Sequence, residues 1–219
     1  MFFHRDPELQ DDVVPVPEGI PSDVIISPDT RRALRVPPGQ SRTKKWPVLD
    51  ASGTPSFSVE NWTLTVDGLV EQPITLTLEE LKAFPKVRVF SDFHCVTRWS
   101  RLGNIWDGVS TREIISRCGG IKAEARFVLA HGLDHGWTTN VPLGDFLTED
   151  ALLAMLHDGE PLSAEHGGPL RLIIPRLYAW KSAKWLTRIE FLADDRAGFW
   201  ERNGYHMRGD PWNEERYGW

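Results

Sequence analysis

The feature that most constrains the fold is the order of short strand-like and helix-like segments, which do not alternate regularly along the chain. Residues 62–68 alternate polar and apolar side chains and end at a turn pair, which predicts a strand. Capping boxes at Thr77–Glu80 and Ser110–Glu113 predict the starts of two short helices. Apolar runs predict further strands, at 70–76, 87–90, 125–130, 138–141, 170–175 and 185–192, and a third helix at 148–157. This order argues against a doubly wound parallel sheet and predicts a mixed α/β domain of the α+β class.

The distribution of proline divides the chain into two parts. Residues 1–50 contain Val14-Pro-Val-Pro-Glu-Gly-Ile-Pro21 and Val36-Pro-Pro-Gly-Gln40, which cannot form long helices or central strands. We therefore predict that residues 1–50 form an extended arm packed on a domain at residues 51–219. A domain of that length buries a sizeable core without disulfide or metal support. Its C-terminal tail, from Arg196, is charged and aromatic with little periodicity.

Charge, cysteine content and hydropathy exclude several classes of protein. The formal net charge is -6 with no long run of Lys and Arg, which argues against a nucleic-acid binder. No stretch reaches the length of a membrane span, and the first residues lack the pattern of a secretory signal. Two cysteines are too few for a disulfide framework, so we predict a cytoplasmic protein. Ten tryptophans indicate either core packing, their default role, or a deep and rigid pocket.

One stretch concentrates reactive side chains, and it reads His94-Cys95-Val-Thr-Arg98-Trp-Ser-Arg101. A thiol beside a histidine and two guanidiniums lies in a positive field, which favours the thiolate that binds metals or attacks electrophiles. The alternative is a small buried hydrophobic residue, the usual role of a free cysteine. Cys118 falls at a predicted helix C-terminus, where the dipole disfavours a thiolate, so we interpret it as structural.

Three other segments carry groups that bind anions. His166-Gly-Gly-Pro-Leu-Arg171 offers glycine N–H groups, a histidine and an arginine, and Lys181-Ser-Ala-Lys184 offers two cations and a hydroxyl. Neither has the spacing of a Walker or dinucleotide motif. Residues 42–49 place three cations beside Trp46, which indicates either a solvated loop or a clamp on an anionic ligand. In combination with Cys95, these segments indicate an anionic cofactor held beside a thiolate.

Two other chemistries are alternatives at this point. His131 and His135, with a cysteine, supply zinc ligand types, although they stand in a glycine-bearing loop and no Cys-x-x-Cys pair is present. Cys95 is also a candidate nucleophile with His166 or His131 as its base, although no acyl-transfer signature surrounds it.

Three motifs in this order resemble the molybdopterin-binding domain of the sulfite oxidase family. They are His94-Cys95-Val-Thr-Arg-Trp-Ser100, His166-Gly-Gly-Pro-Leu-Arg-Leu-Ile-Ile-Pro175 and Lys181-Ser-Ala-Lys-Trp185. The resemblance runs from about Trp62 to Leu192, and the tail from Gly198 to Trp212 is similar to that of small prokaryotic members. It implies the fold of a sulfite oxidase-type molybdopterin-binding domain. It also implies an oxidoreductase that transfers an oxygen atom to or from a small substrate.

The resemblance further implies a role for each motif. Cys95 would be the one protein thiolate on molybdenum, whose other sulfur ligands come from molybdopterin. The pterin or its phosphate would be bound by residues of the later motifs, which are His166, Arg171, Ser182, Ala183 and Lys184. Lys45, His94 and His131 fall where further contacts with the cofactor are expected. Arg98 would hold an oxyanion substrate beside the metal.

The chain also differs from plant and animal sulfite oxidases. Those enzymes have two consecutive arginines shortly after the ligand cysteine, whereas here Arg98 and Arg101 are separated by two residues. Their active-site tyrosine has no clear counterpart, and Trp137 falls near that region. The length leaves no room for haem or dimerisation domains, so we expect a monomer without haem that exchanges electrons with an unidentified carrier. The expected substrate is a small oxyanion or a sulfoxide-type compound. The alternative function is the binding of molybdopterin or another anion without turnover.

Overall fold

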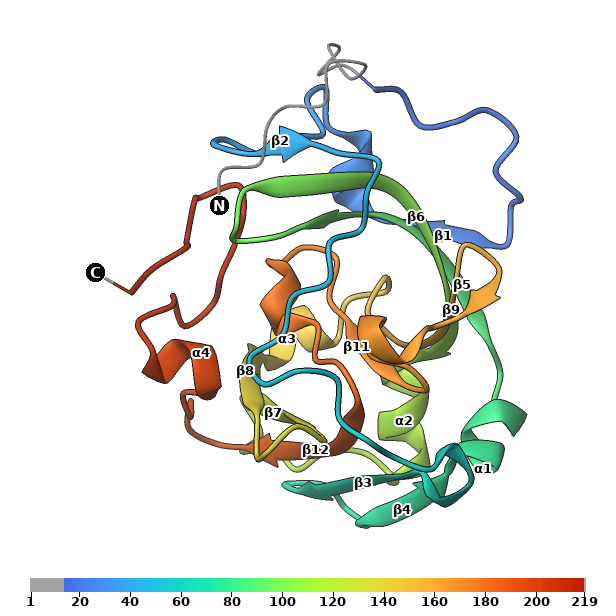
Figure 1. The fold of residues 1–219 in the computed structure, drawn as a ribbon. Helices are drawn as coiled ribbons and strands as arrows, with labels where there is room; N and C mark the ends of the chain where they lie inside the picture. The colour runs from blue at the N-terminus through green and yellow to red at the C-terminus, as the bar shows by residue number, and fades with distance from the viewer. Residues whose placement is uncertain (1–13, 219) are drawn as a thin grey trace.

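Two β-sheets form the frame of the protein in a computed structural model that describes residues 14–218 (Figure 1). Within these residues the first sheet has seven strands, ordered β1-β5-β6-β9-β10, with β2 paired to β6 and β11 paired to β9. Its strands are β1 (Val24–Ile26), β2 (Ser41–Arg42), β5 (Val87–His94), β6 (Trp99–Ser110), β9 (Leu152–His157), β10 (Glu160–Pro161) and β11 (Arg171–Ile173). The second sheet has five strands in the described part, ordered β4-β3-β12-β7-β8. They are β3 (Thr63–Gly68), β4 (Ile74–Thr77), β7 (Phe127–Gly132), β8 (Thr138–Pro142) and β12 (Leu186–Leu192).

Short helices connect these strands. The α-helices are α1 (Leu78–Ala83), α2 (Thr111–Arg117), α3 (Leu143–Phe146) and α4 (Phe199–Arg202). The 3₁₀ helices are η1 (Pro28–Arg31), η2 (Val59–Asn61), η3 (Ala164–His166) and η4 (Ala179–Lys181). The capping box of α1 is confirmed, because Thr77 Oγ1 accepts from the Glu80 N–H at 3.2 Å and the Glu80 carboxylate accepts from the Thr77 N–H at 2.7 Å. Short helices beside two sheets confirm the predicted mixed α/β class.

The predicted helix over residues 148–157 is wrong, since residues Leu152–His157 form strand β9. This strand pairs with β6 on one side and with β10 and β11 on the other. Leu152, Leu153 and Ala154 are fully buried, because successive side chains of β9 are covered on both faces of the sheet. Such a strand has a continuous apolar run, which hydrophobic periodicity does not distinguish from a buried helix.

The β5–β6 pair carries the Cys95 turn at its end. The two strands are antiparallel, and the last register pair before the turn is His94 with Ser100. The final six residues of β5 are buried, and β1 and β9 flank the pair on either side. The turn therefore connects two central strands of the sheet, which restrict its motion more than a long surface loop would.

The segment from residue 14 to residue 50 is tied to the first sheet. Strand β1 pairs in parallel with β5, and β2 pairs in parallel with β6. The fully buried Arg35 donates from Nη2 and Nε to the two carboxylate oxygens of Asp92 in β5, at 2.6 and 2.9 Å. After β2 the chain crosses from the first sheet to the second (Figure 1). The first 13 residues of the predicted arm lie outside the described residues.

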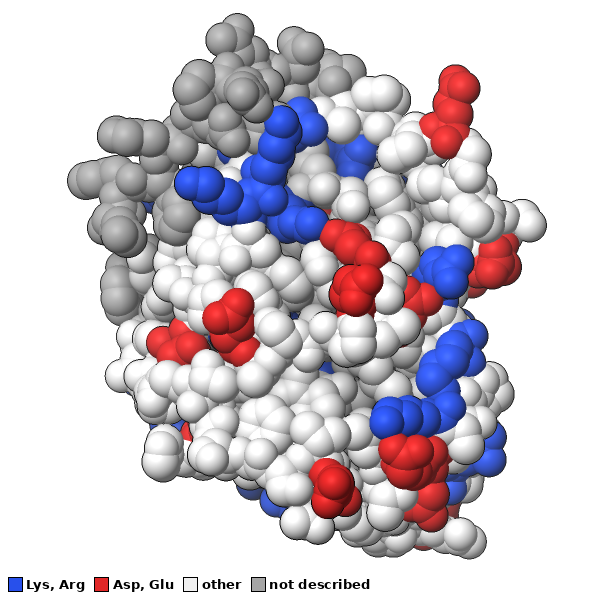
Figure 2. Space-filling model, turned by 45° about the vertical axis from the view of Figure 1, so that its right-hand side comes forward, with Lys and Arg blue, Asp and Glu red and all other residues white. Residues whose placement is uncertain are grey.

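The charged side chains on one face of the protein are dispersed. On the face drawn in Figure 2, basic and acidic residues stand in small separate groups with broad uncharged areas between them. This face has no continuous basic surface of the kind that binds nucleic acid. Among residues 14–218, no helix has the length and apolar character needed to cross a membrane.

Candidate functional site

A cavity of about 210 Å³ lies beside Cys95. Five separate stretches of the chain line it: residues 46–51 before β3, the turn after β5, the turn between β7 and β8, residues 166–185, and the C-terminal tail. Six of the ten tryptophans are among its lining residues, namely Trp46, Trp99, Trp137, Trp180, Trp185 and Trp200. The high tryptophan content therefore builds a pocket in addition to packing the core.

Cys95 opens the tight turn that joins β5 to β6. Its N–H donates to the Trp99 carbonyl, and its own carbonyl accepts from the Arg98 N–H, both at 2.9 Å. The Gln40 side-chain amide also donates to the Cys95 carbonyl at 3.0 Å. These bonds fix the backbone at Cys95, which is 8% exposed and lines the cavity.

Burial and the neighbouring groups shift the pKa of the Cys95 thiol in opposite directions. Burial raises the pKa of Cys95, whereas hydrogen bonding from Thr97 and the guanidiniums of Arg171 and Arg216 lower it. Thr97 Oγ1 donates to Sγ at 3.2 Å. The positive field comes from arginines that are distant in sequence, not from the two arginines that follow Cys95. A cation that binds the sulfur would complete this field, because thiolates in buried sites need a positive partner.

Arg171, the first residue of β11, is a buried cation on the cavity wall that Cys95 also lines. It is 4% exposed and lines the cavity. Nη1 donates to the His166 carbonyl at 2.8 Å, but within residues 14–218 Nε has no acceptor and no carboxylate pairs with the guanidinium. Burial lowers the pKa of Arg171 to about 9, and the Cys95 thiolate opposes this effect. An unpaired buried charge is costly, so this arginine indicates an anionic ligand in the cavity.

Lys184 adds a second cation to the same wall. Its Nζ donates to the Glu165 carbonyl at 2.7 Å and lies 3.8 Å from Asp50 Oδ2. Burial, followed by the charge of Arg171, lowers the pKa of Lys184 to about 8. Ser182, two residues earlier, also lines the cavity, and its Oγ accepts from the Ile174 N–H at 3.0 Å. The strand β11 and helix η4 thus bring two cations and a hydroxyl together.

His166 lines the cavity and links it to the segment that precedes β3. Its ring stacks on Trp46 with centroids 3.9 Å apart. Because a carbonyl oxygen can only accept, the 3.1 Å contact between Nε2 and the Trp46 carbonyl places the proton on Nε2. Ser163 Oγ then donates to Nδ1 at 2.9 Å. Burial lowers the pKa of His166, so this neutral ring is fixed in one tautomer.

Asp134 was missed by the sequence analysis. It lies in the turn between β7 and β8, lines the cavity and is 5% exposed. Its Oδ1 has no hydrogen-bond donor among the described residues, and burial raises the pKa of Asp134 to about 6. The signal was its position in His131-Gly-Leu-Asp134, a turn already expected to contact the cofactor.

The structure does not bring five of the predicted residues to the cavity wall. Their side chains are those of Lys45, His94, Arg98, His131 and Ala183. His94 lies on the opposite face of β5 from Cys95, as neighbours on a strand do, and its Nδ1 is 2.8 Å from Ser100 Oγ. Burial lowers the pKa of His94 to about 4. Arg98 has a backbone φ of 74°, and its Nη1 is directed to the Gly39 carbonyl at 3.4 Å.

The other three residues are placed as follows. Lys45 is exposed, while the next two residues, Trp46 and Pro47, line the cavity in its place. His131 Nε2 is 3.2 Å from Glu190 Oε2 across the β7–β12 pair. Ala183 is fully buried in the core.

The zinc and nucleophile alternatives find little support in this geometry. No group of three or more His, Cys, Asp and Glu side chains in the described part of the chain is arranged to hold a metal ion. His166 shares the cavity with Cys95, but both of its ring nitrogens are engaged by Trp46 and Ser163. It is therefore not oriented as a base for the thiol.

The cavity fits a cofactor that carries acceptors, a phosphate and a thiolate-binding metal. Arg171 Nε and Trp99 Nε1 are buried donors on its wall that have no acceptor among residues 14–218. Asp134 Oδ1 is an acceptor without a donor there. Molybdopterin carries both kinds of partner. Its phosphate and carbonyl oxygens are acceptors for the two N–H groups, and its amino groups are donors for the carboxylate. Its dithiolene metal also matches the soft Cys95 sulfur.

Comparison with known proteins identifies the family of the chain. Residues 51–200 match the family described as oxidoreductase molybdopterin binding domain. The chain therefore belongs to this family of sulfite oxidase-type molybdopterin oxidoreductases, as its motifs predicted. It is 52% identical to the uncharacterized oxidoreductase YuiH of Bacillus subtilis, over 84% of this chain and 93% of that protein.

More distant relatives are longer than this chain. The mitochondrial sulfite oxidase of Drosophila melanogaster is 30% identical over 69% of this chain and 30% of that protein. The protein-methionine-sulfoxide reductase catalytic subunit MsrP of Campylobacter jejuni is 27% identical over 67% of this chain and 54% of that protein. Among solved structures, the sulfane dehydrogenase SoxCD of Paracoccus pantotrophus matches with a TM-score of 0.60 at 24% identity, covering 65% of this chain and 41% of that one. This last match confirms the predicted fold.

Proposed function

We propose that the protein holds a molybdenum–molybdopterin cofactor in the cavity at Cys95 and uses it for oxygen-atom transfer on a small oxyanion or sulfoxide-type substrate. The observation that carries this proposal is the buried Arg171 guanidinium, which has no carboxylate partner among the described residues and lies beside a buried thiol. A cofactor with an anionic phosphate and a metal that binds thiolates satisfies both groups at once.

Each lining residue has a role suited to its chemistry. Cys95 would give its thiolate to the metal. Arg171 and Lys184 would face the phosphate, with the Ser182 hydroxyl as a further donor. The Asp134 carboxylate would accept from the N–H groups of the pterin ring, which are paired donors that suit a carboxylate.

The reaction balances with two electrons and two protons. In the reducing direction, the substrate R=O, two electrons and two protons give R and water, and in the oxidising direction each term is reversed. When bound, the cofactor supplies a metal centre that exchanges one oxygen atom with a change of two electrons. We propose that a separate carrier supplies or removes these electrons. The lining tryptophans would limit the access of bulk water to the substrate, which would strengthen electrostatic contacts in the site.

The test is analysis of the metal and pterin in protein expressed in a host that makes the molybdenum cofactor. We expect molybdenum and oxidised-pterin fluorescence near one equivalent per chain. Cys95→Ser is expected to give a folded protein that has lost activity, whereas Cys118→Ala removes a thiol outside the cavity and is expected to keep both metal and activity. Full turnover in Cys95→Ser would refute the proposed role of this residue.

Turnover separates the enzyme from a protein that binds the cofactor without catalysis. Sulfite oxidation is measured with an artificial electron acceptor, and sulfoxide reduction is measured with an artificial donor. A loaded protein that performs neither reaction, nor reduction of another small oxo compound, would support the binding function instead.

A further inference from the structure

The C-terminal tail closes the Cys95 side of the cavity. Trp200 in helix α4 and Tyr205 after it are lining residues, together with Trp180 from helix η4. Trp180 and Cys95 belong to one buried apolar cluster, and Trp200 and Tyr205 pack against that cluster. Tyr205 lies beyond residues 51–200, the part of the chain that matches the family. Of the three rings, Trp180 and Trp200 lie within that part, and Tyr205 is contributed by the tail that follows it.

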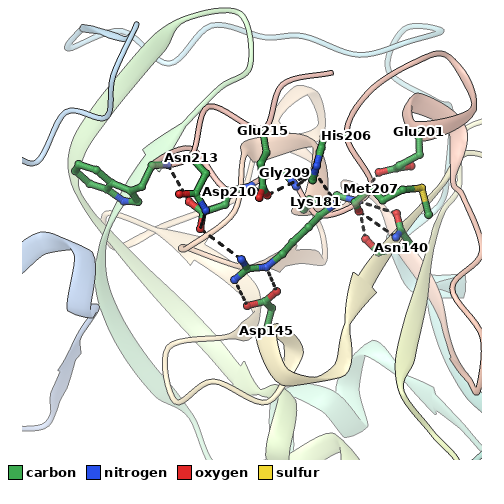
Figure 3. Close-up of polar contacts among 12 residues, drawn as sticks. Asn140, Asp145, Lys181, Glu201, His206, Met207, Gly209, Asp210, Asn213 and Glu215 are labelled. Atoms are coloured by element: carbon green, nitrogen blue, oxygen red, sulfur yellow. Dashed lines mark hydrogen bonds and ion pairs between the residues drawn. The ribbon is translucent and has the colours of Figure 1, made fainter. Parts of the chain in front are cut away.

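A buried ion pair anchors the tail to the rest of the protein (Figure 3). Lys181 Nζ donates to Glu201 Oε1 and to the Met207 carbonyl, both at 2.6 Å, and both charged side chains are fully buried. Glu201 Oε1 also accepts from Trp180 Nε1 at 2.8 Å. One carboxylate thus holds helix α4 against η4, which fixes the tryptophan that each helix presents to the cavity.

The three aromatic rings form a continuous surface. Tyr205 stacks on Trp200 with centroids 5.0 Å apart and meets Trp180 edge-on at 5.1 Å. Gly209 packs so closely beneath Trp180 that an added Cβ would lie 2.7 Å from the indole ring. The tail therefore backs the Trp180 ring on the side of Gly209 and packs against it through Tyr205.

The hydroxyl of Tyr205 is available to a ligand. The residue is partly exposed, and its hydroxyl makes no hydrogen bond to another residue that the structure describes. Burial raises the pKa of Tyr205, and Tyr217 and Cys95 raise it further. The phenol ring packs against the buried apolar cluster that contains Cys95, and both residues line the cavity. At neutral pH this hydroxyl is a donor.

The cation nearest to this aromatic wall, Lys181, lies 5.7 Å from the centre of the Trp180 ring, but it pairs with Glu201 and does not line the cavity. Arg98 is directed to the Gly39 carbonyl, and Arg216 donates to the carbonyls of Val96 and Pro38, so neither side chain lines the cavity. The lining cations Arg171 and Lys184 have the phosphate role in the proposed function. Apart from Arg171, a small oxyanion would find no guanidinium on the cavity wall, because Arg216, whose Nε has no acceptor among the described residues, is not a lining residue. The faces of aromatic rings suit apolar groups.

We propose that Tyr205 is a substrate-binding residue, donating a hydrogen bond to the oxygen atom that is transferred, and that Trp180 and Trp200 receive the apolar substituents of that substrate. The substrate class is then a neutral organic oxo compound of the dialkyl sulfoxide type. This inference rests on the proposed function, because it requires the reacting oxygen to lie near Cys95.

The test compares Tyr205→Phe with Tyr217→Phe, which removes the same atom from the neighbouring tyrosine outside the cavity. Both variants are expected to load molybdenum and pterin as the wild type does. For dimethyl sulfoxide reduction with an artificial donor, Tyr205→Phe is expected to lose roughly three- to tenfold in kcat/KM, the effect of one hydrogen bond. Tyr217→Phe is expected to match the wild type.

A binding measurement provides a readout that is independent of turnover. Dimethyl sulfone, an unreactive analogue with the same acceptor oxygen, is titrated into each loaded protein, and tryptophan fluorescence reports binding at the wall. We expect Tyr205→Phe to raise the Kd by the same roughly three- to tenfold. The wild type is also expected to show a higher kcat/KM for dimethyl sulfoxide than for sulfite.

The outcomes separate this inference from the proposed function. A wild-type protein that loads no molybdenum in a competent host refutes the proposed function and this inference with it. A loaded wild type in which Tyr205→Phe behaves like Tyr217→Phe in both measurements refutes the role of Tyr205 alone. A higher kcat/KM for sulfite than for dimethyl sulfoxide refutes the neutral substrate class.

Discussion

Replacing Arg171 with Met is expected to stabilise the cofactor-free protein and to prevent the extra stabilisation that the cofactor gives. Burial lowers the pKa of Arg171 from 12.5 to about 9. Because one pKa unit corresponds to about 1.4 kcal/mol, holding this charge without an anion costs on the order of 5 kcal/mol. Loss of the hydrogen bond to the His166 carbonyl offsets roughly 1.5–3 kcal/mol of that gain. Arg171→Met should therefore raise the free energy of unfolding of the cofactor-free protein by about 2–3 kcal/mol.

Lys181→Met is the matched contrast. Lys181 is also a fully buried cation, but it pairs with Glu201 at 2.6 Å. Removing it leaves the carboxylate buried without its partner, so we expect a loss of about 3–5 kcal/mol. The two substitutions replace a buried cation with the same side chain, and the structure predicts opposite signs for them.

The assay is urea unfolding of protein expressed in a host that cannot make molybdopterin, repeated with protein from a competent host. Wild type should gain stability on loading, and Arg171→Met should gain none because it does not load. If Arg171→Met destabilises the cofactor-free protein by as much as Lys181→Met does, the guanidinium is satisfied by the protein itself. The inference of an anionic ligand would then be refuted.

Two further predictions concern the cavity wall. Burial raises the pKa of Asp134 from 3.8 to about 6, so the folded state binds a proton more tightly than the unfolded state, and stability that is present below pH 4 is lost as the pH rises through 6. Asp134→Asn of the cofactor-free protein should lack this loss, which is at most about 3 kcal/mol, and equal urea unfolding profiles from pH 4 to pH 7 in both proteins would contradict the shift. Gly167 has φ 99°, and an added Cβ would lie 2.8 Å from the Lys184 Cβ, so Gly167→Ala should lower both the thermal midpoint and the molybdenum content. A normal molybdenum content in that variant would show that this close approach is not needed.

Local sequence signals predicted the elements whose formation depends on neighbouring residues. The α1 capping box and the alternating strand β3 are examples, because a side chain three residues away or a period of two determines each. Strand β9 was mistaken for a helix because its burial depends on partners that come from β6 and β11. Continuous apolar runs carry no information on which neighbours cover them.

The cavity residues divide in the same way into those that local motifs predicted and those that depend on distant contacts. Cys95, His166, Arg171 and Lys184 stand in compact motifs, and the structure brings all four to the cavity. Arg98 is three residues from Cys95, yet a left-handed backbone turns it toward another segment. Asp134 and Tyr205 stand in segments that the resemblance covers, the turn after Ala130 and the tail, but only tertiary contacts bring their side chains to the wall.

The stacking of His166 on Trp46, and its bond to the Trp46 carbonyl, has a consequence for when the cofactor can enter. Residues 46 and 205 are both part of the cavity wall, so the wall is complete after contacts between distant parts of the chain have formed. Such non-local contacts form late in folding, because the entropy of closing long loops must be overcome first. Cofactor insertion is therefore expected to follow the folding of residues 46–205, and the folded cofactor-free protein is the state on which any insertion machinery acts.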